Sequence, residues 1–433
     1  MRKAALFLAL TGMVVAESTE DLPAIVNGEL PSLVEIYKGI HEHPELSHQE
    51  TQTSAKLAEE LRKAGYTVTE NVGKYENGAQ AHGVVAILKN GPGPQLLIRA
   101  DMDALPIVEE TGVDYASQVK GVMHACGHDI HTTTLIGVGR ALAAMKNEWH
   151  GTLMLIGQPS EETIDGARAM LADGLYERFG TPTYAIALHD STLEAAGTVG
   201  LTTGAATTSA TSIDVTIRGV GGHGAFPQMT KDPIVMAAEF IMQLQTIVSR
   251  QENPNDPSIL TVGDIHGGTR RNIIPNEVKL ELTARTFSEQ SREIILDGVH
   301  RTARGVGIAA GVPEDRMPVV TVLENESCPM LYNDPALMTR VRAALTKAIG
   351  SQNVFDAPPV MASEDFPFLG LGRKIPTVMF WLGAANPAKY AAAKAAGTTL
   401  PGPHTNKFQP DPEPTLRTGV IGMTSAAIAL LQN

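Results

Sequence analysis

The chain has 433 residues, 43% of them hydrophobic, so it can bury a large core and is long enough for two or three domains. This composition excludes a disordered or fibrous protein. The formal net charge is −13 and no cluster of Lys and Arg is present, which argues against nucleic acid or an anionic membrane as a partner.

The N-terminus has the pattern of a signal peptide. Arg2 and Lys3 precede an apolar run from Ala4 to Ala16, which is too short to span a bilayer, and an acidic segment follows. We predict cleavage after Ala16, so residues 1–16 are the signal peptide and the mature protein is periplasmic or secreted, with no membrane anchor. The alternative is a buried N-terminal helix, but the run has no amphipathic period.

The next segments predict an α/β domain. Residues 31–65 have a helical period broken at His43-Pro44 and closed by Gly65. Short, continuous apolar runs then read as strands, with a helix over Thr132 to Lys146 among them; the runs are Gly83 to Leu88, Gln95 to Ala100, Thr152 to Gln158, Ala185 to His189 and Thr377 to Gly383. Such runs indicate a largely parallel sheet covered on both faces, whose ligand site lies at the carboxyl ends of the strands.

The middle of the chain predicts a different architecture. Alternating strands and two helices follow in the order βαββαβ, from Ser212 to Leu323. This is the ferredoxin-like order, so we expect an inserted lid domain at 207–325. The flanking pieces, 17–206 and 326–433, then form one discontinuous catalytic domain.

The densest polar cluster runs from His124 to His131. A thiolate at Cys126 and an imidazole at His128 can face one metal from a tight loop, because Gly127 allows close approach of the backbone. The alternative is a capped helix start with surface histidines. The other cysteine, Cys328, could form a disulfide with Cys126 in an exported protein, but the surroundings of Cys126 favour a metal, and Cys328 has no assigned role.

Carboxylates follow two of the predicted strands. Asp101 and Asp103 could bind metal themselves or orient a ligand imidazole from outside the ligand shell, which we favour because His128 and His189 are available; the alternative is solvation of a strand end. Glu161 and Glu162 follow another strand. One of them could bind metal while its neighbour activates water, although an isolated Glu-Glu pair is more often solvent-facing.

His189 closes a buried strand and His404 follows the last one. Each alone is typical of a structural histidine. Together with Cys126, His128 and Glu162 they make five donors near the strand ends of one sheet, which predicts two divalent metal ions. The mixed S, N and O donors suit zinc and also admit manganese, cobalt or nickel.

At this point the residues resemble the M20 metallopeptidase family, in particular its amidohydrolase branch of hippurate hydrolases, aminoacylases and auxin-conjugate hydrolases. The resemblance covers nearly the whole mature chain. The collinear segments that carry it are His43 to Ser47, Arg99 to Pro106, Met123 to His131, Gln158 to Glu162, Gly221 to Pro227, Asn272 to Pro275, Ser363 to Phe366, and His404.

The resemblance implies roles for the ligand set. Cys126 bridges the two metals, Glu162 and His404 complete one site, and His128 and His189 complete the other. Glu161 is the general base that activates a water molecule.

The resemblance also implies roles in the inserted domain. There, His223 reaches the scissile carbonyl, often in a partner subunit, and Asn272 and Arg285 contact the substrate's carbonyl and free carboxylate. Arg285 could instead form an ion pair within the domain. The inserted domain is implied to mediate a homodimer or homotetramer.

The predicted function is hydrolysis of the amide bond of an N-acyl amino acid or a short peptide. Two alternatives remain at this point. One is a dipeptidase or exocarboxypeptidase of the same family. The other is a non-catalytic periplasmic protein that binds peptides or amino-acid conjugates, which would have no reason to keep five metal donors and Glu161. One departure from the family pattern is Asp190, where an apolar residue is expected after His189.

Overall fold

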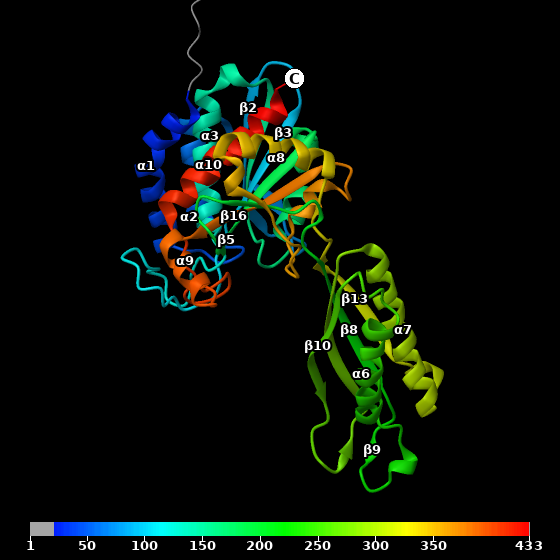
Figure 1. The fold of residues 1–433 in the computed structure, drawn as a ribbon. Helices are drawn as coiled ribbons and strands as arrows, with labels where there is room; N and C mark the ends of the chain where they lie inside the picture. Colours follow the sequence, from blue (N-terminus) through cyan, green and yellow to red (C-terminus); the bar gives the residue numbers. More distant parts are fainter. Residues whose placement is uncertain (1–20, 433) are drawn as a thin grey trace, which may run out of the picture.

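The computed structural model describes residues 21–432, so the predicted signal peptide lies outside the described residues. Two folding units are visible in Figure 1. A larger α/β domain contains both ends of the described chain, and a narrower inserted domain extends away from it.

The larger domain is built on an eight-stranded sheet. Its strand order is β1-β2-β4-β3-β5-β16-β6-β15. The four central strands are parallel, and three of the four outer pairings are antiparallel. The strands are β1 (Thr67–Lys74), β2 (Gln80–Asn90), β3 (Gln95–Asp101), β4 (Gly151–Gln158), β5 (Tyr184–Ala195), β6 (Val199–Leu201), β15 (Val354–Asp356) and β16 (Thr377–Ala385). The prediction of a largely parallel α/β sheet is confirmed for its centre.

Helices cover both faces of this sheet. One core contains side chains of the first, second, third, eighth and tenth helices, including Leu33, Leu57 and Val420. A second core on the other face contains Met170 and Leu175. The helices are α1 (Leu22–Glu42), α2 (Thr51–Lys63), α3 (His128–Ala144), α4 (Gly166–Ala172), α5 (Leu175–Phe179), α8 (Pro335–Ile349), α9 (Pro387–Ala395) and α10 (Pro412–Leu431). Burial on both sides explains why the central strands are continuously apolar.

One described helix, α10, is long and apolar enough to cross a membrane. Its most apolar window is 72% buried inside the protein. Figure 1 shows α10 among the helices that cover the sheet, beside α1 and α3. Its apolar character is therefore that of a core helix.

The inserted domain has the βαββαβ order. Its antiparallel sheet is arranged β10-β12-β8-β13, with α6 and α7 packed on one face around Phe240, Ile295 and Val299. The elements are β8 (Ser209–Arg218), α6 (Pro233–Arg250), β10 (Ser258–Gly267), β12 (Glu277–Thr286), α7 (Glu289–Ala310) and β13 (Val319–Cys328). Two small sheets complete the structure, β9 (Gly222–His223) with β11 (Ile273–Ile274) and β7 (Gly204–Ala205) with β14 (Tyr332–Asn333).

Two local features differ from the sequence interpretation. Helix α3 begins at His128 and not near Thr132, because the left-handed Gly127 (φ +84°) turns the chain directly into the helix. Helix α9 was not predicted; it lies in a stretch before His404, residues 384–403, that is rich in Ala and Gly. Asn386 caps it by accepting hydrogen bonds from the backbone N–H groups of Ala388 and Lys389.

Candidate metal centre

The carboxyl ends of the central parallel strands bring the predicted donors to one edge of the sheet. In the strand register Asp101 lies opposite Gln158, and His189 lies opposite Trp381. The loop that enters α3 adds Cys126 and His128 at the same edge. Residues far apart in sequence therefore meet because parallel strands end together.

All five predicted metal ligands lie together. Ligand atoms of Cys126, His128 and His189 are within 4.8 Å of one another, and so are those of Cys126, Glu162 and His404. The sulfur of Cys126 lies 3.5 Å from Nε2 of His189 and 3.2 Å from Nε2 of His404. Cys126 is the member common to both triads, which places one thiol between two groups of donors.

Two of the imidazoles are oriented by backbone carbonyls. Nδ1 of His128 lies 2.8 Å from the carbonyl oxygen of Asp103, and Nδ1 of His189 lies 2.8 Å from that of Asp190. Each ring therefore donates from Nδ1, and in its neutral form it directs the lone pair of Nε2 to the shared cluster. This is the outer-shell arrangement that fixes metal-binding histidines.

Carboxylates dominate the charge of the cluster. Burial opposes a charged imidazole, but Asp101, Asp103 and Glu162 raise the pKa of His128 well above its ordinary value. Burial and the charge of Glu162 raise the pKa of the Cys126 thiol. Nε2 of His128 and Oε1 of Glu162 are buried without a hydrogen-bond partner in the described chain. Divalent cations fit this cluster, because they neutralise the carboxylates, favour the thiolate and occupy the orphaned donors.

The two aspartates contact residues around the cluster. Asp101 is fully buried and its Oδ1 accepts a hydrogen bond from Nδ1 of His131 at 2.6 Å. The two carboxylate oxygens of Asp103 accept from the backbone N–H groups of Glu161 and Glu162, at 3.1 and 3.0 Å. These contacts are those of residues that hold the donors in place.

Glu161 belongs to neither triad with Cys126, but its carboxylate forms a further group with His128 and Glu162, whose ligand atoms lie within 4.8 Å of one another. It is 8% exposed, and its Oε2 lies 3.9 Å from Nε2 of His128. Burial raises the pKa of Glu161 well above its ordinary value, and the charges of Glu364 and Glu162 add to that effect. In the part of the chain that the structure describes, its carboxylate accepts no hydrogen bond, so it is available to take a proton.

Sequence reasoning gave no role to a buried charge network behind Glu161. Arg99 donates to Asp101, Glu364 and Asp365, at 2.5, 2.7 and 2.9 Å. Its Nε also donates to the side chain of Gln158 at 2.9 Å. The network could have been suspected from two segments of the family resemblance, Arg99 to Pro106 and Ser363 to Phe366. Each places charged residues next to apolar residues that are typical of buried positions.

Asp190, the departure from the family pattern, is also part of the centre. It is fully buried, and its backbone N–H donates to Nε2 of His131 at 2.9 Å. Because a backbone N–H can only donate, a neutral His131 carries its proton on Nδ1 and donates it to Asp101. Burial opposes the charged form of His131, but the charge of Asp101 and hydrogen bonds to Asp101 and Asp190 raise its pKa to about 9. The main chain of Asp190 thus joins His131 to the ligand His189.

The inserted domain supplies one predicted residue to this region. Nη1 of Arg285 donates to Oγ of Ser363 at 2.5 Å, next to Glu364 in the larger domain. His223 and Asn272 are exposed and lie together on the β9–β11 pair. Figure 1 shows β9 at the end of the inserted domain farthest from β5 and β16. His223 therefore does not meet the donor cluster of its own chain.

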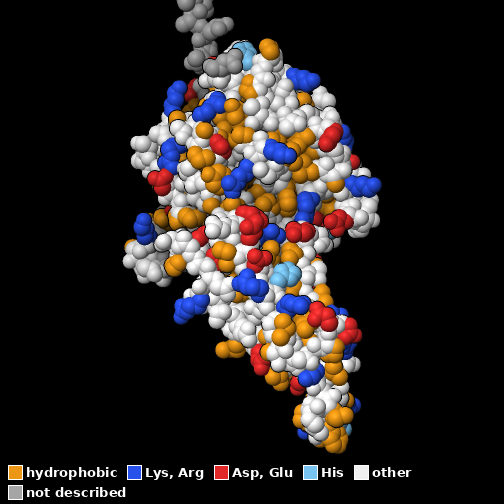
Figure 2. All heavy atoms as spheres, turned by 90° about the vertical axis from the view of Figure 1, so that its right-hand side faces the viewer, with side chains coloured by type: hydrophobic (Ala, Val, Ile, Leu, Met, Phe, Trp, Pro, Cys, Tyr) orange, Lys and Arg blue, Asp and Glu red, His pale blue; other side chains and the backbone are white. Residues whose placement is uncertain are grey.

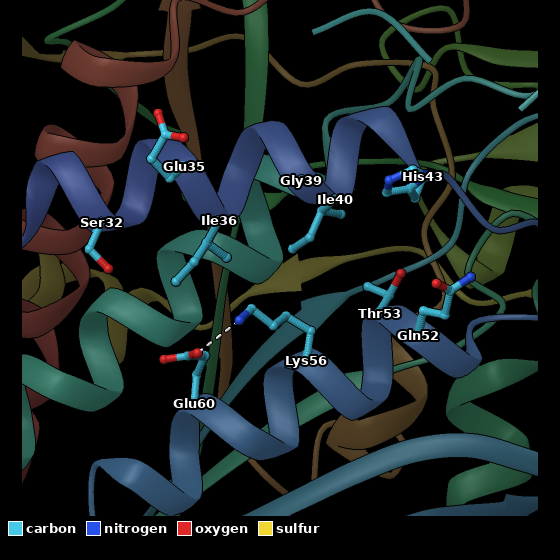
Figure 3. A pocket seen from close by; sticks show the side chains of 10 residues that line it. All are labelled: Ser32, Glu35, Ile36, Gly39, Ile40, His43, Gln52, Thr53, Lys56 and Glu60. Atoms are coloured by element: carbon cyan, nitrogen blue, oxygen red, sulfur yellow. Dashed lines mark hydrogen bonds and ion pairs between the residues drawn. The ribbon is translucent and has the colours of Figure 1, made fainter. Parts of the chain in front are cut away.

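A separate cavity of about 540 Å³ lies between α1 and α2 (Figure 3). None of the predicted site residues lines it. Its Lys56 points to Glu60 and pairs with it at 3.0 Å, so the cation is already neutralised. The donor cluster, and not this cavity, is the candidate reaction centre.

Comparison with known proteins identifies the family. The sequence profile described as "Peptidase family M20/M25/M40" matches residues 97–398. The chain belongs to the M20 peptidase family.

Curated relatives of this M20 protein are hydrolases. It is 34% identical to the hippurate hydrolase of Campylobacter jejuni, over 76% of this chain and 82% of the relative. It is 37% identical to the N-acetyl-L-cysteine deacetylase of Bacillus subtilis, over 78% of this chain and 77% of the relative. It is also 34% identical to thermostable carboxypeptidase 2 of Saccharolobus solfataricus, over 92% and 94% of the two chains.

Solved structures with a similar fold agree with this family assignment. A protein described as an aminohydrolase from methicillin-resistant Staphylococcus aureus has a TM-score of 0.84 at 30% identity, covering 96% of this chain and all of that one. The YXEP protein of Bacillus subtilis, described as a dinuclear metal-binding peptidase of the M20 family, has a TM-score of 0.76 at 27% identity, covering 94% and 99%.

The M20 protein is therefore an enzyme that hydrolyses amide bonds. The prediction of two divalent metal ions is confirmed by the dinuclear relative and by the donor clusters. The alternative of a non-catalytic binding protein is wrong.

Proposed function

We propose that this M20 hydrolase cleaves the amide bond of N-acyl amino acids that carry a free carboxylate, with Glu161 as general base. The supporting observation is the meeting of Cys126, His128, Glu162, His189 and His404 beside a buried Glu161 that belongs to neither triad formed with Cys126. Relatives named as a hippurate hydrolase and a deacetylase act on substrates of this class.

In this proposal, Cys126 is shared between two metal positions. His128 and His189 would hold one ion, and Glu162 and His404 would hold the other. Bound divalent ions supply Lewis-acid polarisation of the attacking water and of the amide carbonyl.

The protein residues then move one proton twice. The carboxylate of Glu161 accepts a proton from the attacking water as the new C–O bond forms at the amide carbon. Glu161 then donates that proton to the leaving nitrogen as the C–N bond breaks, which releases a carboxylic acid and a free amino acid. The raised pKa of Glu161 suits both roles, because a stronger base takes the proton readily and still returns it.

Recognition of the free carboxylate is assigned to Arg285. A guanidinium binds a carboxylate through two parallel hydrogen bonds. Arg285 already reaches the larger domain through Ser363, so it stands at the boundary between the two domains. No ion pair to Arg285 is present in the described chain, which leaves its charge available to a substrate.

We further propose that the active enzyme is a dimer formed through the inserted domain. Strand β10 is an edge strand with exposed Ile259 and Ile265. Hydrophobic side chains also lie at the end of the inserted domain in Figure 2. Just after β9 in the chain, Phe226 and Met229 are 55% and 75% exposed. A second copy that covers this surface could bring its His223 and Asn272 to the substrate carbonyl, which a single chain does not do.

A panel of substrates tests the reaction. Hippurate, N-acetyl amino acids, dipeptides and C-terminally amidated analogues would each be incubated with the protein loaded with zinc, manganese, cobalt or nickel. Turnover of acyl amino acids, and its loss on amidation of their carboxylate, is expected. Turnover restricted to peptides would instead support a carboxypeptidase or dipeptidase, which the carboxypeptidase relative favours.

Export is proposed on the signal peptide alone. N-terminal sequencing of protein recovered from the periplasm or medium is expected to begin at Glu17. Recovery of intact Met1 would contradict it.

A further inference from the structure

We propose that Glu50 and Ser47, in the segment between α1 and α2, are positioning residues for the general base. This inference rests on the proposed role of Glu161. Ser47 ends one segment of the family resemblance and Glu50 lies just beyond it, and neither side chain contacts a metal donor.

The loop that carries Glu161 and Glu162 has a strained start. Ser160 has φ +54°, in the left-handed region that disfavours residues other than glycine. This turn directs the backbone N–H groups of Glu161 and Glu162 to the two oxygens of Asp103, at 3.1 and 3.0 Å. The two side chains then leave the loop in fixed and different directions, as a base and a ligand require.

Glu50 stabilises that turn. Its Oε1 accepts hydrogen bonds from the backbone N–H of Ser160 at 2.7 Å and from Oγ of Ser160 at 3.0 Å. It also accepts from the backbone N–H of His48 at 3.1 Å. Oγ of Ser160 in turn lies 2.6 Å from the hydroxyl of Tyr75. Both the backbone N–H and the hydroxyl of Ser160 therefore have hydrogen-bond partners.

Ser47 holds the other anchor of the loop. Its Oγ donates to Oδ2 of Asp103 at 2.7 Å, the same oxygen that accepts from the backbone of Glu162. The backbone of the segment is joined to the Asp103 loop, because Ala104 donates to the carbonyl of Glu45 at 2.8 Å. One short segment therefore fixes both Asp103 and Ser160, on either side of Glu161.

The burial of Glu50 argues that the carboxylate has more than a structural purpose. It is fully buried and its Oε2 has no hydrogen-bond partner in the described chain. Burial and the charge of Asp103 raise the pKa of Glu50 to about 7. A carboxylate so placed is costly to the fold, and the contacts that it makes are all to the segment and loop on which Glu161 depends.

Kinetics of three variants test the proposal. In Glu50→Ala and Ser47→Ala, kcat for the N-acyl amino acid turned over by the unaltered enzyme is expected to fall by about ten- to a hundredfold, because the base is misplaced. KM and bound metal, measured by elemental analysis, should stay close to those of the unaltered enzyme. Glu50→Gln retains an oxygen that can accept from Ser160, so it should recover most of the loss.

Glu45→Ala is the matched control. Glu45 belongs to the same segment, but its carboxylate caps α2 by accepting from the backbone N–H groups of Gln52 and Thr53, each at 2.9 Å. Its loss is expected to lower the melting temperature of the holoenzyme and leave kcat unchanged at temperatures where the protein is folded.

Several outcomes would overturn the proposal. These are an unchanged kcat in Glu50→Ala, an equal fall in Glu45→Ala, a loss of bound metal, or no recovery in Glu50→Gln. If Glu50→Ala does not fold, Ser47→Ala decides alone through its kcat. If Glu161→Gln retains full turnover, the proposed function fails; if Glu161→Gln is inactive while Glu50→Ala is fully active, only the positioning role fails.

Discussion

The carboxylate of Asp190 occupies the space that a side chain at position 127 would need. A Cβ placed on Gly127 would lie 1.9 Å from Oδ1 of Asp190, and Gly127 has φ +84°. The residue between two metal donors is thus restricted to glycine by its backbone conformation and by a buried neighbour. The main chain of Asp190 also contacts two histidines: its carbonyl oxygen accepts from Nδ1 of His189, and its N–H donates to Nε2 of His131.

Gly127→Ala should therefore disrupt the metal centre. Strain at positive φ alone is expected to cost about 1 kcal/mol, and the contact with Asp190 adds to it. Gly121→Ala is the matched control, since Gly121 has φ +79° with nothing within 4 Å of its Cβ position. Denaturant unfolding and elemental analysis should show a larger loss of stability, and a loss of metal, at position 127 only. Equal effects at both positions would refute the role of Asp190.

Removing the base and removing the shared donor should have different consequences. Glu161→Ala is expected to keep both metals and lose about 10²-fold or more in kcat, because only the proton transfer is removed. Cys126→Ala is expected to lose metal, because the thiol belongs to both donor triads. Metal content and turnover, measured on the same preparations, separate the two cases. Full turnover in Glu161→Ala would remove it from the mechanism.

Stability should fall at alkaline pH through a buried ion pair outside the donor cluster. Burial opposes the charged form of His41, but hydrogen bonds to Asp129 and Glu109 raise its pKa from 6.5 to about 9. The folded state therefore holds this proton more tightly than the unfolded state. The stabilisation is complete below pH 6.5 and is lost as the pH rises through about 9.

The difference between the folded and unfolded pKa values of His41 corresponds to a change of about 3 kcal/mol in the free energy of unfolding. Unfolding of the unaltered protein and of His41→Gln across that range measures it. The exposed His43 provides the control substitution, His43→Gln. A stability profile of His41→Gln identical to that of the unaltered protein would contradict the assignment.

Arg285 should control affinity for the free carboxylate. Arg285→Lys keeps the charge but loses the two-pronged hydrogen-bonding geometry, so KM for an N-acyl amino acid is expected to rise about tenfold or more. Any residual turnover of the C-terminally amidated substrate should not change, since that substrate lacks the group recognised. An equal effect on both substrates would mean that Arg285 acts only through Ser363 and the contact between domains.

A dimer that exchanges His223 should show complementation. His223→Ala and Cys126→Ala subunits are each expected to be nearly inactive. Co-expression allows heterodimers in which the Cys126→Ala subunit supplies its intact His223 to the metal centre of the other. With random pairing, activity should recover to about a quarter of the unaltered level. No recovery, in a sample shown to contain heterodimers, would place His223 outside the reaction.

Local sequence patterns and the family resemblance predicted the main sheet, the inserted domain and the metal donors. The continuous apolar strands around Ile98, Leu155 and Ile186 indicated a sheet buried on both faces. The βαββαβ order of the middle segment could be predicted from its alternating strand patterns and two helical patterns alone. The spacing of Cys126 and His128 around a glycine pointed to a metal, because all three residues lie in one turn.

Other features depend on contacts that no local pattern encodes. Arg99 meets Glu364 across 265 residues, and Ser160 meets Glu50 across 110. The need for glycine at position 127 follows from Asp190, which reaches it only after β5 lies beside β3.

The sequence by itself determined the long apolar strands of the sheet, the βαββαβ order of the inserted domain and which side chains have metal-binding chemistry, since periodicity and residue type are local properties. Only the tertiary structure decided which of those side chains share a site. It gathered five donors at the ends of parallel strands and left His223 at the far end of another domain. The physical reason is that the order of strands in the sheet, and not distance along the chain, sets which residues become neighbours.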